Sequence, residues 1–389
     1  MKVILGTASS DMVGVATHVF NLAKLLHAEG SLDLVACPRA GWLSDQLADC
    51  GLPYTVLQIS PDPRTFIKSN VAFARLLQER KTADIVHLHG RFPLFVSSLS
   101  LRACRDRTFV ATVHQFKQQI ADGQLGWKAR LETLLLKRMQ RICCVSQDLK
   151  DEVMARIGPK NGGRVDVIAN WIEPLWARKS GAMLRERSVP TDKEVRICAV
   201  GYLHPVKGFD VLLEAVHILR QRGWRARCDI FGSGPEKRNL LALTAKLGLS
   251  EFVTFKDPAA DLRCFLPEYN AVVVPSRSES FSLVVLEAYD AAVPVVASNV
   301  SGLRTTVVDG ETGLLFEQNN AASLAEKLID LFSREGLAAR LAGKARKHLE
   351  NYVPNEKLRK CYSDFYAMAQ ADRNNSSRDR RQDVRNSLL

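Results

Sequence analysis

The sequence has no Cys-x-x-C motif, and none of its apolar runs approaches the ~18–20 residues that a membrane-spanning helix needs. The nine cysteines are an odd number without metal-ligand spacing, and most fall in or beside short apolar runs, where cysteine behaves as a small hydrophobic residue. The first segment, MKVILGTASSD, is too short for a signal peptide. These absences predict a cytoplasmic protein without disulfides, a structural metal or a membrane span.

The length and composition are those of a globular protein with two domains. The chain has 389 residues, of which 46% are hydrophobic and 25% are charged. Lys and Arg number 54 against 42 Asp and Glu, a net charge of +12. Such a surplus fits nucleic-acid binding, an anionic membrane surface, or a solvated surface without a partner. The chain shows no nucleic-acid-binding module and no basic patch with interleaved aromatic residues, so we expect no nucleic-acid partner.

Short apolar runs alternate with longer amphipathic stretches along most of the chain. Many runs are continuously apolar, as is typical of parallel strands that are covered on both faces. The amphipathic stretches carry apolar residues at helical spacing and end in Gly. The alternation occurs twice, which predicts an α/β fold of two doubly wound, Rossmann-like domains that face each other across a cleft. The expected strands are 2–8, 33–39, 54–59, 84–90, 109–114, 141–146, 165–170, 195–201, 228–234, 252–257, 271–276, 294–300 and 313–316.

A Pro-containing, highly charged segment at 171–194 separates the two halves. We therefore predict one domain over 1–180 and another over 181–370, with the last helices of the second returning toward the first. The segment 371–389 is polar and basic, which indicates a disordered tail.

Ligands of open parallel sheets bind beyond the carboxyl ends of the strands, so the loops there are the first place to look for a site. The loop after 271–276 contains Glu279 and leads into a helix that begins near Ser282 and carries Glu287 in its second turn. The free amides of a first helical turn attract a phosphate, and a carboxylate beyond them can accept the hydroxyls of a ribose. A solvated glutamate followed by an ordinary helix glutamate would give the same pattern.

Two further loops of the second half fit a phosphate-bearing ligand. Lys207 precedes Gly208 between a strand and a helix, where a lysine can reach a diphosphate as a point charge. Gly232 lies in the turn Phe-Gly-Ser-Gly-Pro-Glu after the next strand, and glycine there lets a ligand approach the backbone. Each loop alone has a plainer explanation, but all three fall at one edge of the predicted sheet.

On these motifs the sequence resembles the retaining, nucleotide-sugar-dependent glycosyltransferases of the GT-B fold, family 4, also called glycosyl transferases group 1. The segment 195–316 carries the Lys-Gly-x-Asp turn, the Gly-x-Gly-Pro-Glu turn, the Glu-x7-Glu motif and Asp-Gly-Glu-Thr-Gly-Leu-Leu-Phe in the family's order. The first half resembles the family more diffusely, through Gly14, His87-Leu-His89, His114 and Asn170.

The resemblance implies a role for each matching residue. Lys207 would neutralise the donor's diphosphate, Glu279 would contact the transferred sugar, and Glu287 would hold the ribose. His114 would touch the donor sugar or stabilise charge at the reaction centre, and Gly14 would leave room for phosphate. The remaining donor-binding positions would be Gly232 and the backbone amides of Phe281, Ser282 and Leu283.

The chain also departs from the family's pattern. Tyr202 stands where the family usually has an arginine, so one cation for the diphosphate is missing unless Arg277, Arg304 or the phenol replaces it. The sequence has no Asp-x-Asp pair to hold Mg²⁺ or Mn²⁺, so we expect no metal and no other cofactor. His18, His87 and His89 fit packing as well as function.

The basic surplus is concentrated in the first half. Residues 1–180 carry 24 basic and 16 acidic side chains, a net of +8, whereas 181–389 carry +4. Within 127–141 five cations meet one acid, which indicates either an ordinary helix with a basic face or a helix that lies on anionic lipid.

The leading hypothesis is a retaining glycosyltransferase that moves a sugar from a nucleotide-sugar donor to a glycan or lipid-linked glycan, in polysaccharide or lipopolysaccharide biosynthesis. It would work in the cytoplasm or at the inner face of the cytoplasmic membrane. Two alternatives remain, a sugar-nucleotide epimerase of GT-B fold and a non-catalytic nucleotide-sugar-binding or scaffold protein.

Overall fold

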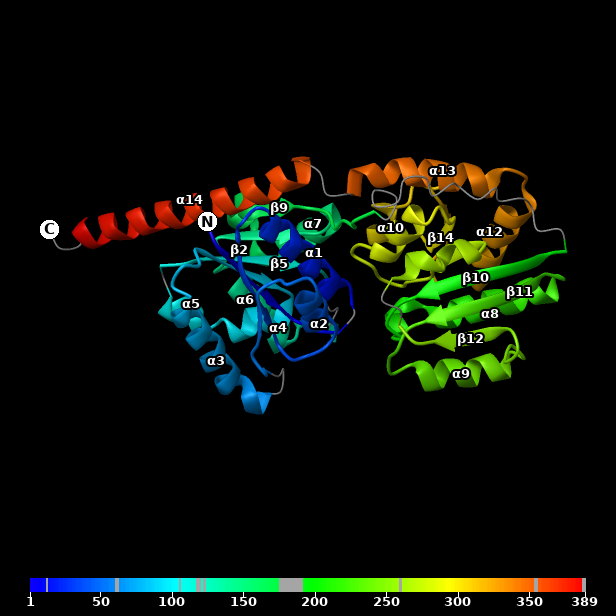
Figure 1. Ribbon diagram of the computed structural model, residues 1–389, viewed down its shortest axis with the longest axis horizontal. Helices are drawn as coiled ribbons and strands as arrows, with labels where there is room; N and C mark the ends of the chain where they lie inside the picture. The colour runs from blue at the N-terminus through cyan, green and yellow to red at the C-terminus, as the bar shows by residue number, and fades with distance from the viewer. Residues whose placement is uncertain are drawn as a thin grey trace. The chain divides into compact units, whose positions relative to one another are not determined.

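A computed structural model describes residues 1–11, 13–59, 63–104, 106–116, 120–121, 124–174, 192–258, 261–352 and 356–386 (Figure 1). The chain forms two compact units. The first unit comprises 1–169 and 354–389, and the second comprises 170–353. The sequence placed the division at 180/181. Most of the expected linker, 175–191, lies outside the described residues.

The first unit is built on a seven-stranded sheet in which every pairing is parallel. Its order is β3-β2-β1-β4-β5-β8-β9, so the chain winds outward from β1 in one direction and then returns to wind in the other. The strands are β1 (Val3–Thr7), β2 (Leu32–Cys37), β3 (Tyr54–Val56), β4 (Ile85–His89), β5 (Thr108–Val113), β8 (Arg141–Cys144) and β9 (Val165–Val167).

The helices of the first unit form two sets. Helices α1 (Gly14–Ala28) and α2 (Trp42–Asp49) pack together, whereas α3 and α4, α4 and α6, and α6 and α7 are neighbours in turn. The long helix α14 packs on β5 and β8. The other helices of this unit are α3 (Phe66–Glu79), α4 (Arg91–Val96), α5 (Ser100–Ala103), α6 (Trp127–Leu136), α7 (Gln147–Ile157) and α14 (Glu356–Asn386), with 3₁₀ turns at Pro63–Thr65 and Pro159–Arg164.

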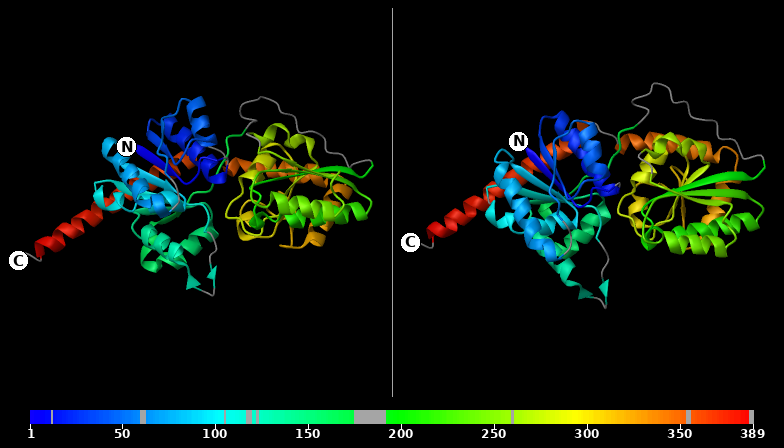
Figure 2. Two further views of the ribbon diagram at one scale, coloured as in Figure 1. Left: turned by 90° about the horizontal axis from the view of Figure 1, so that it is seen from below. Right: turned by 60° about the horizontal axis from the view of Figure 1, so that its bottom comes forward.

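The second unit has a parallel six-stranded sheet of order β12-β11-β10-β13-β14-β15. Helices α8, α9 and α12 pack on one side of it and α10 and α13 on the other (Figure 2). The strands are β10 (Glu194–Val200), β11 (Arg225–Phe231), β12 (Val253–Lys256), β13 (Ala271–Val274), β14 (Val295–Ser298) and β15 (Leu314–Phe316). The helices are α8 (Phe209–Gln221), α9 (Lys237–Lys246), α10 (Leu283–Asp290), α11 (Ser301–Arg304), α12 (Ala321–Ser333) and α13 (Leu337–Leu349), with 3₁₀ turns at Pro205–Lys207, Leu262–Cys264, Leu266–Glu268 and Glu350–Tyr352.

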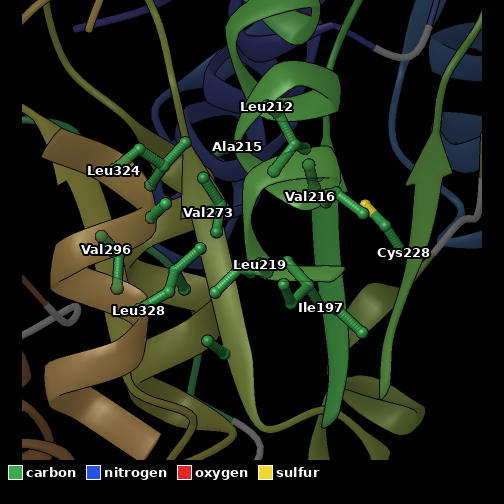
Figure 3. Close-up of a cluster of buried hydrophobic side chains, with 14 of the residues drawn as sticks. Ile197, Leu212, Ala215, Val216, Leu219, Cys228, Val273, Val296, Leu324 and Leu328 are labelled. Carbon is green, nitrogen blue, oxygen red and sulfur yellow. The ribbon is translucent and has the colours of Figure 1, made fainter. Parts of the chain in front are cut away.

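The core of the second unit shows why the helical periodicity was informative. Helix α8 buries Leu212, Val216 and Leu219 on the stripe that faces the sheet. Figure 3 shows these side chains meeting Ile197 and Val273 from the strands and the leucines of α12. The continuously apolar strands are buried on both faces, as a doubly wound sheet requires.

All thirteen strands that the sequence predicted are present, and no predicted end differs from the observed end by more than three residues. The sequence analysis missed a two-stranded antiparallel hairpin, β6 (Ile120–Ala121) and β7 (Gln124–Leu125). Two-residue strands are too short to give a periodic signal. The basic stretch 127–141 is helical only to Leu136, and its last cation, Arg141, is a buried residue of β8.

The expectation of a disordered tail from 371 is wrong for 371–386, which continue α14. The helix is anchored because Tyr362, Phe365 and Tyr366 are buried in the first unit. Asp372 then forms an ion pair with Arg141, at 3.1 Å between Oδ2 and Nη1. The composition of 371–386 is polar and gave no sign of the buried apolar residues that precede this segment on the same helix.

The α14 anchor predicts unequal effects of two substitutions on one helix. Phe365 is 1% exposed and Met368 is 40% exposed. We expect Phe365→Ala to lower the free energy of unfolding by ~3–5 kcal/mol because it leaves a cavity, and Met368→Ala to change it by no more than ~0.5 kcal/mol. Urea unfolding followed by circular dichroism measures both values. Equal effects would mean that α14 does not pack as described.

Candidate functional site

A lysine and a glutamate meet at the carboxyl ends of two neighbouring strands of the second unit. Lys207 ends the 3₁₀ turn after β10, and Glu279 lies in the loop after β13. Lys207 Nζ donates to Glu279 Oε2 at 2.6 Å, and Ser276 Oγ donates to the same oxygen at 3.3 Å. Both charged side chains remain partly exposed. The pair is therefore preformed and still accessible to a ligand.

A second ion pair ties the same two loops together. Arg277 donates to both carboxylate oxygens of Asp210, at 2.8 and 2.6 Å, and its Nη1 also donates to the Pro205 carbonyl. Burial raises the pKa of Asp210, but the hydrogen bonds and charge of Arg277 outweigh it, so that pKa lies below its usual value. Arg277 thus links the loop that contains Glu279 to the loop that contains Lys207.

Glycines let the backbones of these loops approach each other. A Cβ on Gly208, which has φ 64°, would lie 2.1 Å from the Pro275 carbonyl oxygen. A Cβ on Gly302, in α11, would lie 1.9 Å from the carbonyl oxygen of Glu279. Contacts this short are impossible for any side chain, so both positions require glycine. The imidazole of His204 accepts from the Val206 amide at 3.3 Å and caps the turn that presents Lys207.

The loop of Glu279 ends at the N-terminus of α10. Ser282 is the N-cap residue, with extended backbone angles, and Leu283 is the first helical residue, close to the predicted start. Phe281 and Ser282 are buried, and Leu283 is partly buried. The first turn of any helix has amides without intrahelical partners, so this helix end offers donors for an anion.

Glu287 lies in the second turn of α10, as predicted, and its environment is unusual. Burial raises its pKa to about 7, against the opposing charge of Arg263 and with smaller contributions from Asp261 and Asp290. Arg263 is itself paired with Asp261 at 2.8 Å and with Asp290 at 3.1 Å. Glu287 therefore stands next to a cation that two other carboxylates already neutralise.

The other expected donor loop contains Gly232. A Cβ on Gly232 would lie 1.9 Å from the Gly201 carbonyl oxygen, so the turns after β10 and β11 are in backbone contact. Tyr202, in the position of the family arginine, is 50% exposed and stacks on His204 with ring centroids 6.3 Å apart. Arg304 donates to Asn299. Of the replacements considered for the missing cation, Arg277 is fixed by Asp210 and Arg304 by Asn299.

The first unit contributes the remaining predicted residues. Gly14 is the exposed first residue of α1, and a Cβ there would meet no described atom within 4 Å. His114 follows β5 and is partly buried. Its Nε2 lies 3.3 Å from His89 Nδ1, and its ring lies 4.7 Å from that of His18.

His114 belongs to a cluster of four histidines, His18, His87, His89 and His114, which we call the histidine cluster. Burial lowers the pKa values of His87, His89 and His114 well below the usual range, and the neighbouring imidazoles lower them further. These rings are therefore neutral at pH 7. Tyr366 and Thr112 bond the two nitrogens of His87, at 2.8 and 2.7 Å.

The predicted site residues are divided between the two units. In the second unit Lys207 and Glu279 are in direct contact. The same loop continues through Phe281 and Ser282 into α10, which carries Leu283 and Glu287. Sequence reasoning missed the Arg277–Asp210 pair, although Asp210 belongs to the Lys-Gly-x-Asp motif that could have prompted it. It also missed Arg263, which no motif marks.

Comparison with known proteins supports this picture. Residues 183–348 match the family described as Glycosyl transferases group 1, and residues 12–174 match Glycosyltransferase Family 4. The chain belongs to the glycosyltransferases of group 1 and family 4, which confirms the resemblance.

The curated relatives of this chain include proteins named D-inositol 3-phosphate glycosyltransferase. That of Rhodococcus jostii (strain RHA1) is 32% identical over 64% of this chain and 59% of its own length. That of Frankia alni is 37% identical over 47% of this chain and 48% of its own length. The chain thus spans about half the length of the curated relatives it matches.

Solved structures agree on the fold. The chain resembles Anabaena Alr3699/HepE in complex with UDP and glucose, with a TM-score of 0.79 and 19% identity over 94% of this chain and 99% of the other. Sucrose-phosphate synthase from Thermosynechococcus elongatus gives a TM-score of 0.76 and 20% identity over 95% and 100%. At such identities the likeness establishes the fold alone, and that fold is GT-B, with two Rossmann-like sheets.

The glycine contact beneath Glu279 predicts a large difference between two Gly→Ala changes. We expect Gly302→Ala to destabilise the protein by at least ~1–3 kcal/mol because its methyl group collides with the Glu279 carbonyl. Gly343→Ala, in the interior of α13 with no atom within 4 Å, should stabilise it by ~0.5–1 kcal/mol. Thermal unfolding of both variants measures the difference. An unchanged midpoint for Gly302→Ala would show that the Glu279 loop does not lie against α11.

Proposed function

We propose that this protein is a retaining glycosyltransferase that uses a nucleotide-sugar donor. The observation that carries the proposal is the Lys207–Glu279 ion pair, preformed at 2.6 Å at the carboxyl edge of a doubly wound sheet. A cation suits the diphosphate, and a carboxylate beside it suits sugar hydroxyls. Membership of a glycosyltransferase family and the UDP and glucose named for the Anabaena structure support this choice.

Each site residue has a proposed role. Lys207 neutralises the diphosphate, with the amides of Phe281, Ser282 and Leu283 at the start of α10 as further donors to its oxygens. Glu279 contacts the transferred sugar, and Glu287 accepts the ribose hydroxyls. The remaining sites are Gly232 and Gly14, which leave room at the backbone, and His114, which contacts the donor sugar.

The chemical step is the departure of a nucleoside diphosphate from the anomeric carbon. Negative charge grows on the leaving phosphate, so fixed cations and amide dipoles that point there stabilise the transition state most. Lys207 and the start of α10 supply them without a metal or another cofactor. Retaining hydrolases use two carboxylates ~5–5.5 Å apart, whereas Glu279 is committed to Lys207. We therefore assign the base to the donor's own phosphate, with attack on the same face.

We propose a glycan or lipid-linked glycan as acceptor, in polysaccharide or lipopolysaccharide biosynthesis on the cytoplasmic side of a membrane. The surface of α6 supports a membrane contact. Its acid, Glu132, is buried and pairs with Arg91 at 2.7 Å, so the helix exposes only cations among its charged residues. Trp127 and Leu134 are exposed beside those cations. The described residues contain no helix with the length and apolar character that crossing a membrane requires.

One assay distinguishes the candidate functions. The pure protein is incubated with UDP-, GDP- and ADP-sugars, alone, with a membrane lipid extract, or with a phosphorylated inositol, the acceptor class that the curated relatives' names suggest. Nucleotide release that requires the lipid extract supports the proposal. Release that requires the phosphorylated inositol changes the acceptor class, and epimer formation without an acceptor indicates an epimerase. Binding without turnover indicates a scaffold protein.

We expect Lys207→Ala and Glu279→Ala each to lower turnover by at least ~100-fold, the usual effect of removing an electrostatic group from a transition state. Because the two side chains act as a pair, the double variant should lose far less than the product of the two single losses. Lys237→Ala, in α9, serves as the control with unchanged turnover. Turnover near that of the parent protein in both single variants would rule out this site.

The raised pKa of Glu287 predicts that donor binding depends on pH. Above pH 7 the carboxylate is ionised and accepts two hydroxyl groups, whereas below it the group is protonated and loses an acceptor. With a pKa of about 7, the dissociation constant for UDP-glucose should fall about tenfold between pH 6 and pH 8. Calorimetric titration measures it, since the diphosphate diester does not titrate in this range. Glu287→Gln should bind more weakly and without this pH dependence; a slope that survives in this variant would assign the titration elsewhere.

A further inference from the structure

The histidine cluster of the first unit brings imidazoles together from three elements. His18 comes from the first turns of α1, His89 from the end of β4, and His114 from the residue after β5. One ring nitrogen of each lies within 4.8 Å of one ring nitrogen of each of the other two. No other group of three His, Cys, Asp or Glu residues in the described part of the chain converges in this way.

Two of these imidazoles already have the spacing of metal ligands. His89 Nδ1 and His114 Nε2 are 3.3 Å apart. Zinc–nitrogen bonds of ~2.0–2.1 Å at a tetrahedral angle place two ligand nitrogens about 3.3 Å from each other. A hydrogen bond between the rings gives a similar distance, so this pair alone does not decide between the two.

The burial of His89 favours a ligand. Its side chain is 0% exposed, and its Nε2 is buried without a hydrogen-bond partner among the described residues. A fully buried polar atom without a partner costs free energy that a folded protein normally avoids. The orphaned Nε2 and the Nδ1 that faces His114 are different atoms of one ring, so an ion binds one of them. At Nε2 the ion would supply the missing partner, and at Nδ1 it would replace the contact with His114.

The surroundings resemble the support that ligand imidazoles have in metal sites. Tyr362 Oη lies 3.5 Å from His18 Nε2. His87 stacks on His89 with centroids 4.1 Å apart, and Tyr366 and Thr112 occupy its two nitrogens. His87 is therefore a residue that orients His89, and the ligands number three.

We propose that His18, His89 and His114 bind one divalent transition-metal ion, with zinc and cobalt as the fitting class. His114 is only partly buried, so it gives the ion a path of entry and leaves a fourth position for water. The ion is not required for sugar transfer. If His114 contacts the donor sugar, which rests on the proposed function, the bound ion occupies that imidazole and inhibits transfer.

Cobalt is the probe because tetrahedral Co²⁺ absorbs visible light. The titration uses the full chain with Cys50→Ser and Cys264→Ser, which removes the two exposed thiols. We expect one equivalent of Co²⁺ to give intense bands between about 500 and 650 nm, typical of a tetrahedral site, and one equivalent of Zn²⁺ to abolish them. His89→Ala and His114→Ala should each lose the bands. His27→Ala, an exposed histidine on the same helix as His18, is the control that keeps them.

Folding and binding are separated by a second measurement. With EDTA present, His114→Ala should unfold at nearly the temperature of the parent protein, because His114 is partly exposed. Zn²⁺ should raise the unfolding temperature of the parent but not of this variant. Absence of a one-to-one cobalt spectrum, or its persistence in His114→Ala, would overturn the proposal. Neither readout uses a sugar donor, so the outcome is independent of the proposed glycosyl transfer.

Discussion

Backbone contact between the loops at the carboxyl edge of the second sheet is the constraint on which the candidate donor site depends. Gly208 lies against Pro275, Gly302 against Glu279, and Gly232 against Gly201. Parallel pairing brings the ends of these strands to one edge, but ordinary side chains would keep the loops apart. Glycines remove that separation, and a salt bridge of 2.6 Å between Lys207 and Glu279 becomes possible. The site thus depends on glycines, which have no side chain, as much as on its charged residues.

The two ion pairs at this edge differ in how many hydrogen bonds a ligand would have to break in order to bind the cation. Arg277 makes a bidentate contact with Asp210 and a third bond to a carbonyl, so a diphosphate would have to break three bonds to recruit it. Lys207 makes one contact with Glu279, and an ammonium group can serve a phosphate oxygen and a carboxylate together. The position of the missing family arginine is therefore not refilled by Arg277. In the reaction that we propose, leaving-group stabilisation at this edge would come from Lys207 and the start of α10.

The sequence predicted the fold because buried parallel strands and amphipathic helices leave periodic signals, and it predicted the Lys207–Glu279 loops because they carry motifs. It could not predict contacts between residues that share no motif. His18 and His114 are 96 positions apart in the chain and meet only because α1 and the end of β5 lie at the same part of the sheet. The tail was misjudged for the same reason. Its helix is anchored by the buried Phe365 and Tyr366, and its Asp372 pairs with Arg141, 231 positions away in the chain. Composition reports on a segment, whereas order depends on what the segment packs against.

The basic side chains at two places in the structure differ in what surrounds them. At the carboxyl edge of the second sheet Lys207, Arg277 and Arg263 each have a carboxylate partner, so these cations add no net charge to the surface there. On α6, Glu132 is buried against Arg91, while Lys128 and Arg130 are exposed. The ion pair between Glu132 of α6 and Arg91 of α4 fixes the two helices against each other, although burying a charged pair costs desolvation free energy. The charged side chains that α6 exposes are then all basic. The basic surface of α6 therefore arises because this helix turns its acid inward, and the helix also exposes Trp127. Such a face fits the membrane contact that we propose, because a lipid interface can accommodate an apolar ring and cations together.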